Sequence, residues 1–104
     1  MEKVTITEII DDLRVADEIT RRYERRYWLS SADFYKLYQQ GLLDDGEHTD
    51  EFSEWSAFYQ IKVDREEVLK ELSSERVIHL QEEQKTEFIE IASYEPAYAL
   101  PVGA

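Results

Sequence analysis

Apolar residues that recur at steps of three and four positions constrain the fold of this chain more than any other feature. Near the N-terminus they form one continuous stripe: Ile6, Ile9, Ile10, Leu13, Ala16, Ile19, Tyr23 and Tyr27. Thr5 and Glu8 have the T-x-x-E spacing of a helix capping box. Acidic residues come early in this segment and arginines come late, as the helix dipole favours. The pattern predicts an amphipathic helix over residues 6–28.

A second, shorter helix is predicted over residues 31–40. Ser30 or Ser31 is of the type that caps a helix N-terminus, and the aromatic and leucine side chains that follow supply an apolar face. Gly41 is of the type found just past a helix end, where the backbone turns left-handed. The acidic stretch after it is expected to be a connection.

A third helix is predicted over residues 50–74, with Thr49 or Asp50 as its cap, and it can run on towards residue 82. Both prolines of the chain lie after residue 95, so no proline interrupts the three predicted helices. We therefore expect a mainly α protein, with a small three-helix domain over residues 1–76.

Residues 77–104 are predicted to form an extended C-terminal tail. Part of it, EFIEI at residues 87–91, has partial strand character. A lone strand has no pairing partner inside a helical domain. The tail is therefore expected either to dock on its own core or to lie extended and available to a partner, and the sequence leaves both arrangements open.

The net charge of −12 is unevenly placed. Residues 1–43 hold seven basic and eight acidic side chains, a net charge of −1, whereas residues 44–104 hold five basic and sixteen acidic side chains, a net charge of −11. Such a field repels nucleic acid and attracts basic partners. Solubility alone explains the acidic residues equally well, so the charge by itself does not identify a function.

The composition also bears on the compartment. No cysteine occurs, so the chain has no disulfide, thiolate nucleophile or cysteine-based zinc site. No run of about 18 apolar residues is present, so no membrane-spanning helix is expected. The first residues lack the basic-then-apolar pattern of a signal peptide. We expect a cytoplasmic protein without a membrane partner.

No catalytic or metal-binding motif stands out. His48 and His79 have no nucleophile pattern near them, so we expect neither enzyme activity nor a cofactor. The acidic stretch over residues 44–54 is rich in oxygen ligands. If Gly46 were the sixth residue of an EF-hand loop, however, Gly41 would occupy the first ligand position and offer no carboxylate. No metal site is predicted.

The one concentrated basic feature is a group of four arginines, Arg21, Arg22, Arg25 and Arg26. On a helix they make two adjacent rows, which either bind a phosphate or carboxylate group or pair with the acidic second half of the chain. We favour pairing within the chain, because sixteen acidic residues belong to that half. No direct contact with nucleic acid is therefore expected.

Aromatic residues give the strongest signal for a binding surface. Ten of them lie between residues 23 and 59, more rings than a thin three-helix domain readily buries. Most must form the core, and we expect some to face a partner, since Tyr and Trp commonly anchor protein interfaces. The ten are Tyr23, Tyr27, Trp28, Phe34, Tyr35, Tyr38, Phe52, Trp55, Phe58 and Tyr59.

A resemblance adds to this interpretation. The motif YWLSSADFYKLYQQG at residues 27–41 precedes an acidic gap and then EWSAFY at residues 54–59. In this order of motifs, residues 10–72 resemble a family of small bacterial and archaeal antitoxin-like proteins encoded beside small toxin genes. The resemblance implies that residues 10–72 form a helical body and that the tail contacts the toxin.

Together these observations predict a non-catalytic binding protein, an antitoxin that covers the active site of a small basic toxin. The alternative is an acidic DNA mimic that inhibits a DNA-binding protein, as an anti-defence protein does. The oligomeric state is left open, a homodimer included. The residues expected to bind the partner are Phe88, Ile89, Ile91, Tyr94 and Tyr98 in the tail and Trp55 in the body.

Overall fold

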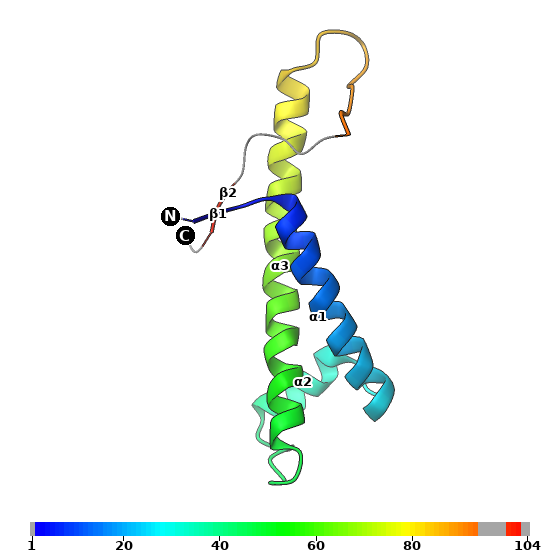
Figure 1. The fold of residues 1–104 in the computed structure, drawn as a ribbon, viewed down its shortest axis with the longest axis vertical. Helices are drawn as coiled ribbons and strands as arrows, with labels where there is room; N and C mark the ends of the chain where they lie inside the picture. Colours follow the sequence, from blue (N-terminus) through cyan, green and yellow to red (C-terminus); the bar gives the residue numbers. More distant parts are fainter. Residues whose placement is uncertain (1, 94–99, 103–104) are drawn as a thin grey trace.

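The computed structural model describes residues 2–93 and 100–102, which form three helices and one pair of short strands (Figure 1). The mainly α architecture predicted from the sequence is confirmed. The elements in chain order are β1 (Glu2–Val4), α1 (Ile6–Tyr27), α2 (Ser31–Gln39), α3 (Thr49–Glu82) and β2 (Leu100–Val102).

The first two helices begin and end where their sequence signals predict. Oγ1 of Thr5 accepts a hydrogen bond from the backbone N of Glu8 at 3.2 Å, and Oε2 of Glu8 accepts one from the backbone N of Thr5 at 3.1 Å, which completes the capping box of α1. At the start of α2, Oγ of Ser30 accepts from the backbone N of Asp33 at 3.1 Å. Gly41 follows α2 with a φ of 73°, the left-handed conformation that favours glycine.

The start of α3 differs from the prediction. The N-cap is His48, which makes no side-chain capping bond, while Thr49 and Asp50 already belong to the first turn. Asp45 satisfies the preceding backbone instead, because its Oδ1 accepts hydrogen bonds from the backbone N of Glu47 at 2.9 Å and of His48 at 3.0 Å. A carboxylate three residues before the N-cap thus shapes the start of the helix.

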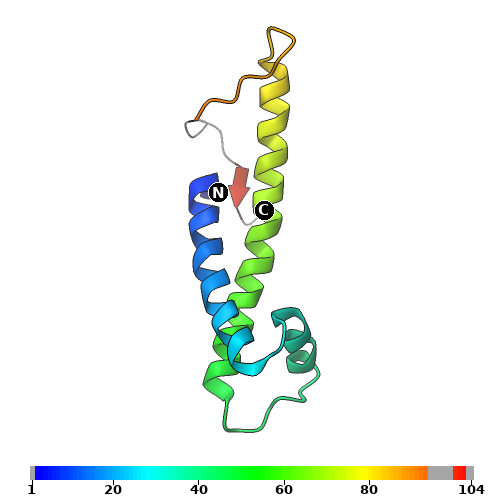
Figure 2. The ribbon, with the colours of Figure 1, turned by 90° about the vertical axis from the view of Figure 1, so that its right-hand side faces the viewer.

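Helices α1 and α3 lie side by side and run in opposite directions (Figures 1 and 2). The small side chain of Ala16 is fully buried on the apolar face of α1. Two ion pairs join the helices beside this face: Nζ of Lys62 lies 2.9 Å from Oδ1 of Asp17, and Nε of Arg65 lies 3.0 Å from Oδ2 of Asp12. Exposed pairs of this kind stabilise a fold only slightly, but they link positions far apart in the sequence.

The densest part of the core is a cluster of rings where α2 packs against the two longer helices. Trp55 is its centre: its ring lies parallel to that of Phe34 with centroids 3.8 Å apart, and it stacks on Tyr23 at 5.5 Å. Phe52 completes the buried cluster. The prediction that Trp55 binds a partner is wrong, because only 1% of this residue is exposed and the neighbouring rings occupy its surface.

The tail also differs in detail from the prediction. Residues 87–91, which have partial strand character in the sequence, have no regular secondary structure, and the strand forms at β2 instead. It pairs antiparallel with β1, with Val4 opposite Leu100 and Glu2 opposite Val102. The sequence argument missed this partner because β1 precedes the first helix and has only three residues. In addition, α3 runs on through the predicted boundary at residue 76 to Glu82.

The molecule is elongated. Its extents are 61 × 29 × 20 Å, and its Cα radius of gyration is 18.2 Å, whereas a compact chain of this length has a radius of about 13 Å. The cause is α3, whose 34 residues span about 51 Å at the α-helical rise. Its last turns extend beyond the start of α1 (Figures 1 and 2), and Leu72 is the last buried side chain along it. Such a shape leaves many side chains exposed.

Candidate functional site

Among the described residues, large exposed apolar side chains lie in the segment that follows α3. Phe88 is 77% exposed and Ile91 is 70% exposed, while Ile89 between them is less exposed. Glu87 and Glu90 alternate with these residues and form no ion pair within the described part of the chain. We call residues 87–91 the acidic–apolar segment. Tyr94 and Tyr98, which were predicted to act with it, lie outside the described residues.

Few interactions hold this segment in place. Thr86 bonds locally, because its Oγ1 donates to the carbonyl oxygen of Phe88 at 3.1 Å. After the segment, Nη2 of Arg76 donates to the carbonyl oxygen of Ala92 at 3.3 Å, so the chain turns back along the upper turns of α3. Figures 1 and 2 show this return of the chain beside α3, in orange. The acidic–apolar segment thus lies exposed near α3 and is not packed into the core.

Two carboxylates of the acidic second half, Glu51 and Glu54, form contacts inside the fold. Glu54 accepts a hydrogen bond from the hydroxyl of Tyr23 at 2.9 Å, and Glu51 accepts one from the hydroxyl of Tyr27. Burial, followed by the bond to Glu54, raises the pKa of Tyr23 to about 12. Glu51 also pairs with Arg26 at 2.9 Å. These contacts join α3 to α1, so both carboxylates have partners within the fold.

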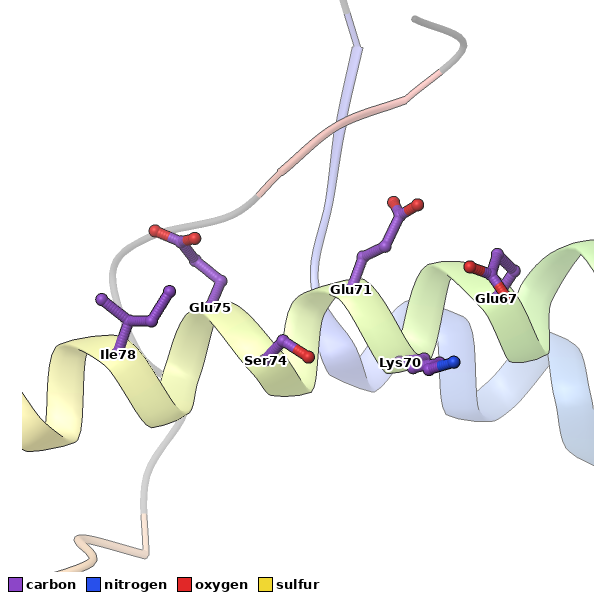
Figure 3. A pocket seen from close by; sticks show the side chains of 6 residues that line it. All are labelled: Glu67, Lys70, Glu71, Ser74, Glu75 and Ile78. Carbon is purple, nitrogen blue, oxygen red and sulfur yellow. The ribbon is translucent and has the colours of Figure 1, made fainter.

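A further group of carboxylates lies farther along α3 and faces solvent. Glu67, Glu71 and Glu75 follow one another at four-residue steps and therefore share a face of the helix. With Lys70, Ser74 and Ile78 they line an open depression, shown in Figure 3. Glu75 also lies 3.1 Å from Nε2 of His79. This acidic face adjoins the turns of α3 along which the C-terminal chain returns.

The four arginines of α1 do not behave alike. The preferred interpretation, pairing with the second half of the chain, holds for Arg26, which pairs with Glu51 of α3. Arg21 instead pairs within its own helix, with Asp17 at 3.2 Å and Glu24 at 2.8 Å. Arg22 and Arg25 are exposed and form no ion pair with any described residue. Two cationic groups of the predicted patch are therefore available to solvent.

Trp28 is the most exposed of the ten aromatic residues between positions 23 and 59. The sequence argument did not single it out as a binding residue. Trp28 is 91% exposed, whereas the other nine rings of the aromatic group are buried or partly buried. It is the C-cap of α1 and has a left-handed backbone, with a φ of 56°. The available signal was its place at the predicted end of the helix, just past the last stripe residue, Tyr27. A residue at the C-cap no longer has the helical backbone conformation, so its side chain does not continue the apolar face of the helix.

The acidic loop before α3 forms a hydrogen-bonded turn. Nδ1 of His48 lies 2.8 Å from Oδ2 of Asp45, and the imidazole stacks on Phe52 with centroids 5.3 Å apart. Hydrogen bonds from His48, first from its side chain, lower the pKa of Asp45 to about 2. The same bond raises the pKa of His48. Within residues 2–93 and 100–102, no group of three His, Cys, Asp or Glu side chains is arranged to hold a metal ion.

Across the part of the chain that the structure describes, no helix is both long and apolar enough to cross a bilayer. Comparison with protein-family models, with curated proteins and with solved structures finds no match to this chain. The resemblance to antitoxin-like proteins therefore stays a prediction, and the function is argued below from the exposed surfaces.

Proposed function

We propose that this chain is a non-catalytic binding protein, and specifically an antitoxin that neutralises a small basic toxin by covering its active site. The observation that carries the proposal is the exposure of Phe88 and Ile91, at 77% and 70%, next to Glu87 and Glu90, which form no ion pair with any described residue. Removing an apolar side chain of this size from water contributes about 1.5–3 kcal/mol. Two such residues in one short segment offer a strong anchor for a partner.

The backbone and charge of the acidic–apolar segment favour the same kind of partner. A segment with no regular secondary structure can lie along a groove or add a strand to an exposed sheet edge. Glu87 and Glu90 within it, together with the acidic face of α3, complement a basic active site and speed the encounter with it. Enzymes that cleave or bind RNA commonly carry such basic sites, because their substrate is a polyanion.

The test is co-expression with the gene that neighbours this one. We expect the two proteins to copurify and the neighbour to inhibit growth when expressed alone. Phe88→Ala with Ile91→Ala should abolish both copurification and growth rescue while the far-ultraviolet circular dichroism keeps its helical signal. The matched control is Leu42→Ala, since Leu42 is also an exposed apolar residue (66%) but lies in the loop after α2. A harmless neighbour that does not copurify would refute the proposal.

A second candidate, an acidic DNA mimic, is favoured by one observation, the row formed by Glu67, Glu71 and Glu75 (Figure 3). Residues four apart on a helix are separated by about 6 Å along its axis, so the row presents regularly spaced negative charges. The two functions separate experimentally. Substitution of all three residues by Gln should remove inhibition by a DNA mimic, whereas an antitoxin should lose activity chiefly through Phe88 and Ile91.

A further inference from the structure

A basic and aromatic patch lies at the C-terminal end of α1 of this otherwise acidic protein. Arg22 and Arg25 are one turn apart on the helix and form no ion pair with described residues. Trp28 is one turn further on, at the C-cap, and is 91% exposed. We call these three residues the Arg–Trp patch. Guanidinium groups beside an indole bind carboxylates together with apolar side chains, and Trp and Arg are the residues most enriched at interface anchors.

The position of Trp28 is fixed by its neighbours. Its backbone N–H donates to the carbonyl oxygen of Glu24 at 2.8 Å. Leu29 packs against the aromatic core, and the backbone N of Ser31 donates to Oε2 of Glu24 at 2.9 Å. The backbone of Trp28 thus has a left-handed conformation, which glycine would adopt without strain. The backbone that carries this exposed ring is therefore ordered, and Trp is among the residue types most enriched at interface anchors.

The acidic–apolar segment is the chemical complement of this patch. Glu87 and Glu90 supply two exposed carboxylates without ion-pair partners among the described residues, to match two guanidinium groups without such partners. Phe88 and Ile91 supply exposed apolar surface for the indole of Trp28. The two surfaces are therefore complementary in charge, and both expose apolar side chains that can pack together.

The two surfaces cannot meet within one molecule. The end of α1 contacts α3 at Glu51 and Glu54, and the chain after the segment contacts α3 at Arg76. From residue 54 to residue 76 a straight helix rises about 33 Å. Figures 1 and 2 show the C-terminal end of α1 and the chain that follows α3 on the same side of α3, near its opposite ends.

We propose that the acidic–apolar segment of one copy binds the Arg–Trp patch of a second copy. Two chains placed antiparallel along α3 make this contact twice, once at each end, which gives a closed dimer with twofold symmetry. The net charge of −12 on each chain opposes association. That repulsion is screened beyond about 8 Å at physiological ionic strength, whereas the ion pairs form at contact.

This dimer uses the segment that the proposed function assigns to the toxin, so self-association and toxin binding exclude each other. The dimer does not rest on that function, however, and is tested on the purified chain alone. We therefore expect the acidic–apolar segment to be buried in the dimer contact of the free protein. A partner that binds the segment more tightly should dissociate the dimer.

Charge reversal gives a sharp test by sedimentation equilibrium. Variant one carries Arg22→Glu and Arg25→Glu, and variant two carries Glu87→Arg and Glu90→Arg. Each alone faces like charges at both contacts and should dimerise about tenfold more weakly or worse. An equimolar mixture pairs opposite charges at both contacts and should recover the dimer. The control Arg14→Glu changes an exposed arginine of α1 outside the patch and should leave dimerisation at the wild-type level.

Three results would overturn the proposal: a monomeric wild type, a dimer that both variants form as well as the wild type does, or a mixture no better than its components. Circular dichroism verifies that each variant is folded. As a second measurement, a fluorescent peptide of residues 84–93 should bind the wild type and lose about tenfold in affinity for Trp28→Ala. Binding of a single-stranded RNA oligonucleotide through Arg22 and Arg25, with no binding of the peptide, would also contradict it.

Discussion

Nε1 of Trp55 donates a hydrogen bond to Oγ of Ser31 at 2.8 Å, inside the aromatic core. The hydroxyl of Ser31 in turn donates to Oε2 of Glu24 at 2.8 Å, and the backbone N of Ser31 donates to the same oxygen at 2.9 Å. One serine therefore joins all three helices, with Glu24 from α1 and Trp55 from α3. The carboxylate ends the chain of bonds because it only accepts.

Ser31→Ala should lower the free energy of unfolding by about 1–3 kcal/mol, because it leaves the buried indole N–H of Trp55 without its acceptor. Urea denaturation followed by circular dichroism measures this loss. The control is Ser30→Gly, which removes only the cap of α2 and should change stability by a few tenths of a kcal/mol. A Ser31→Ala variant as stable as the wild type would mean that the hydrogen bond is not maintained in solution.

The two tryptophans should respond oppositely to truncation. Trp55→Ala is expected to cost about 3–5 kcal/mol, because the ring is 1% exposed and stacks on two other rings. Trp28→Ala should stay within about 0.5 kcal/mol of the wild type, because its ring is 91% exposed. Urea midpoints of the two variants check both values. Equal losses for the two variants would contradict the placement of one ring in the core and the other on the surface.

Trp28→Gly should raise the free energy of unfolding by about 0.5–1 kcal/mol. The residue has a φ of 56°. A left-handed backbone disfavours a non-glycine residue by about 1–2 kcal/mol, which exceeds the entropy that glycine gains in the unfolded chain. The measurement is again a urea midpoint, with Trp28→Ala as the comparison. If the glycine variant is more stable yet no longer dimerises, the tryptophan at this position serves binding at the expense of stability.

How far the sequence predicts the fold can be judged from the helix ends. Thr5, Ser30 and Gly41 each act locally, through bonds or backbone angles within a few residues. Thr5 and Gly41 were predicted as they occur, and Ser30 was one of two predicted caps. The cap of α3 was not, because Asp45 acts from the preceding loop and its geometry depends on how that loop folds. Local signals are readable from sequence, whereas signals that depend on loop conformation are not.

The candidate binding surfaces also divide into features that the sequence predicts and features that depend on tertiary packing. The sequence left open whether residues 87–91 dock on the core or stay extended, and the structure exposes Phe88 and Ile91. Their partial strand character did not become a strand, because a sequence pattern does not reveal whether a pairing partner lies nearby. The aromatic count predicted rings at the surface but not which ones. Trp55 and Trp28 are the same residue type, and only the packing of α2 against α3 buries the first and leaves the second exposed.

The stability of the loop before α3 should depend on pH through His48 and Asp45. The pKa of His48 is raised above its ordinary value of 6.5 by its hydrogen bond to Asp45, so this contribution is complete below pH 6.5 and is lost as pH rises through the raised value. The pKa of Asp45 is lowered from 3.8 to about 2, so its contribution is complete above pH 3.8 and is lost as pH falls through about 2. The loop should be most stable between these limits.

An NMR titration of the imidazole protons of His48 checks this prediction. Asp45→Asn should return the pKa of His48 towards its ordinary value, because the amide carries no charge to stabilise the imidazolium. Asp44→Asn is the matched control, since Asp44 is the adjacent acid and has no hydrogen bond to His48 in the structure. If the two variants shift the titration of His48 equally, the effect comes from the general acidity of the loop and not from the bonded pair.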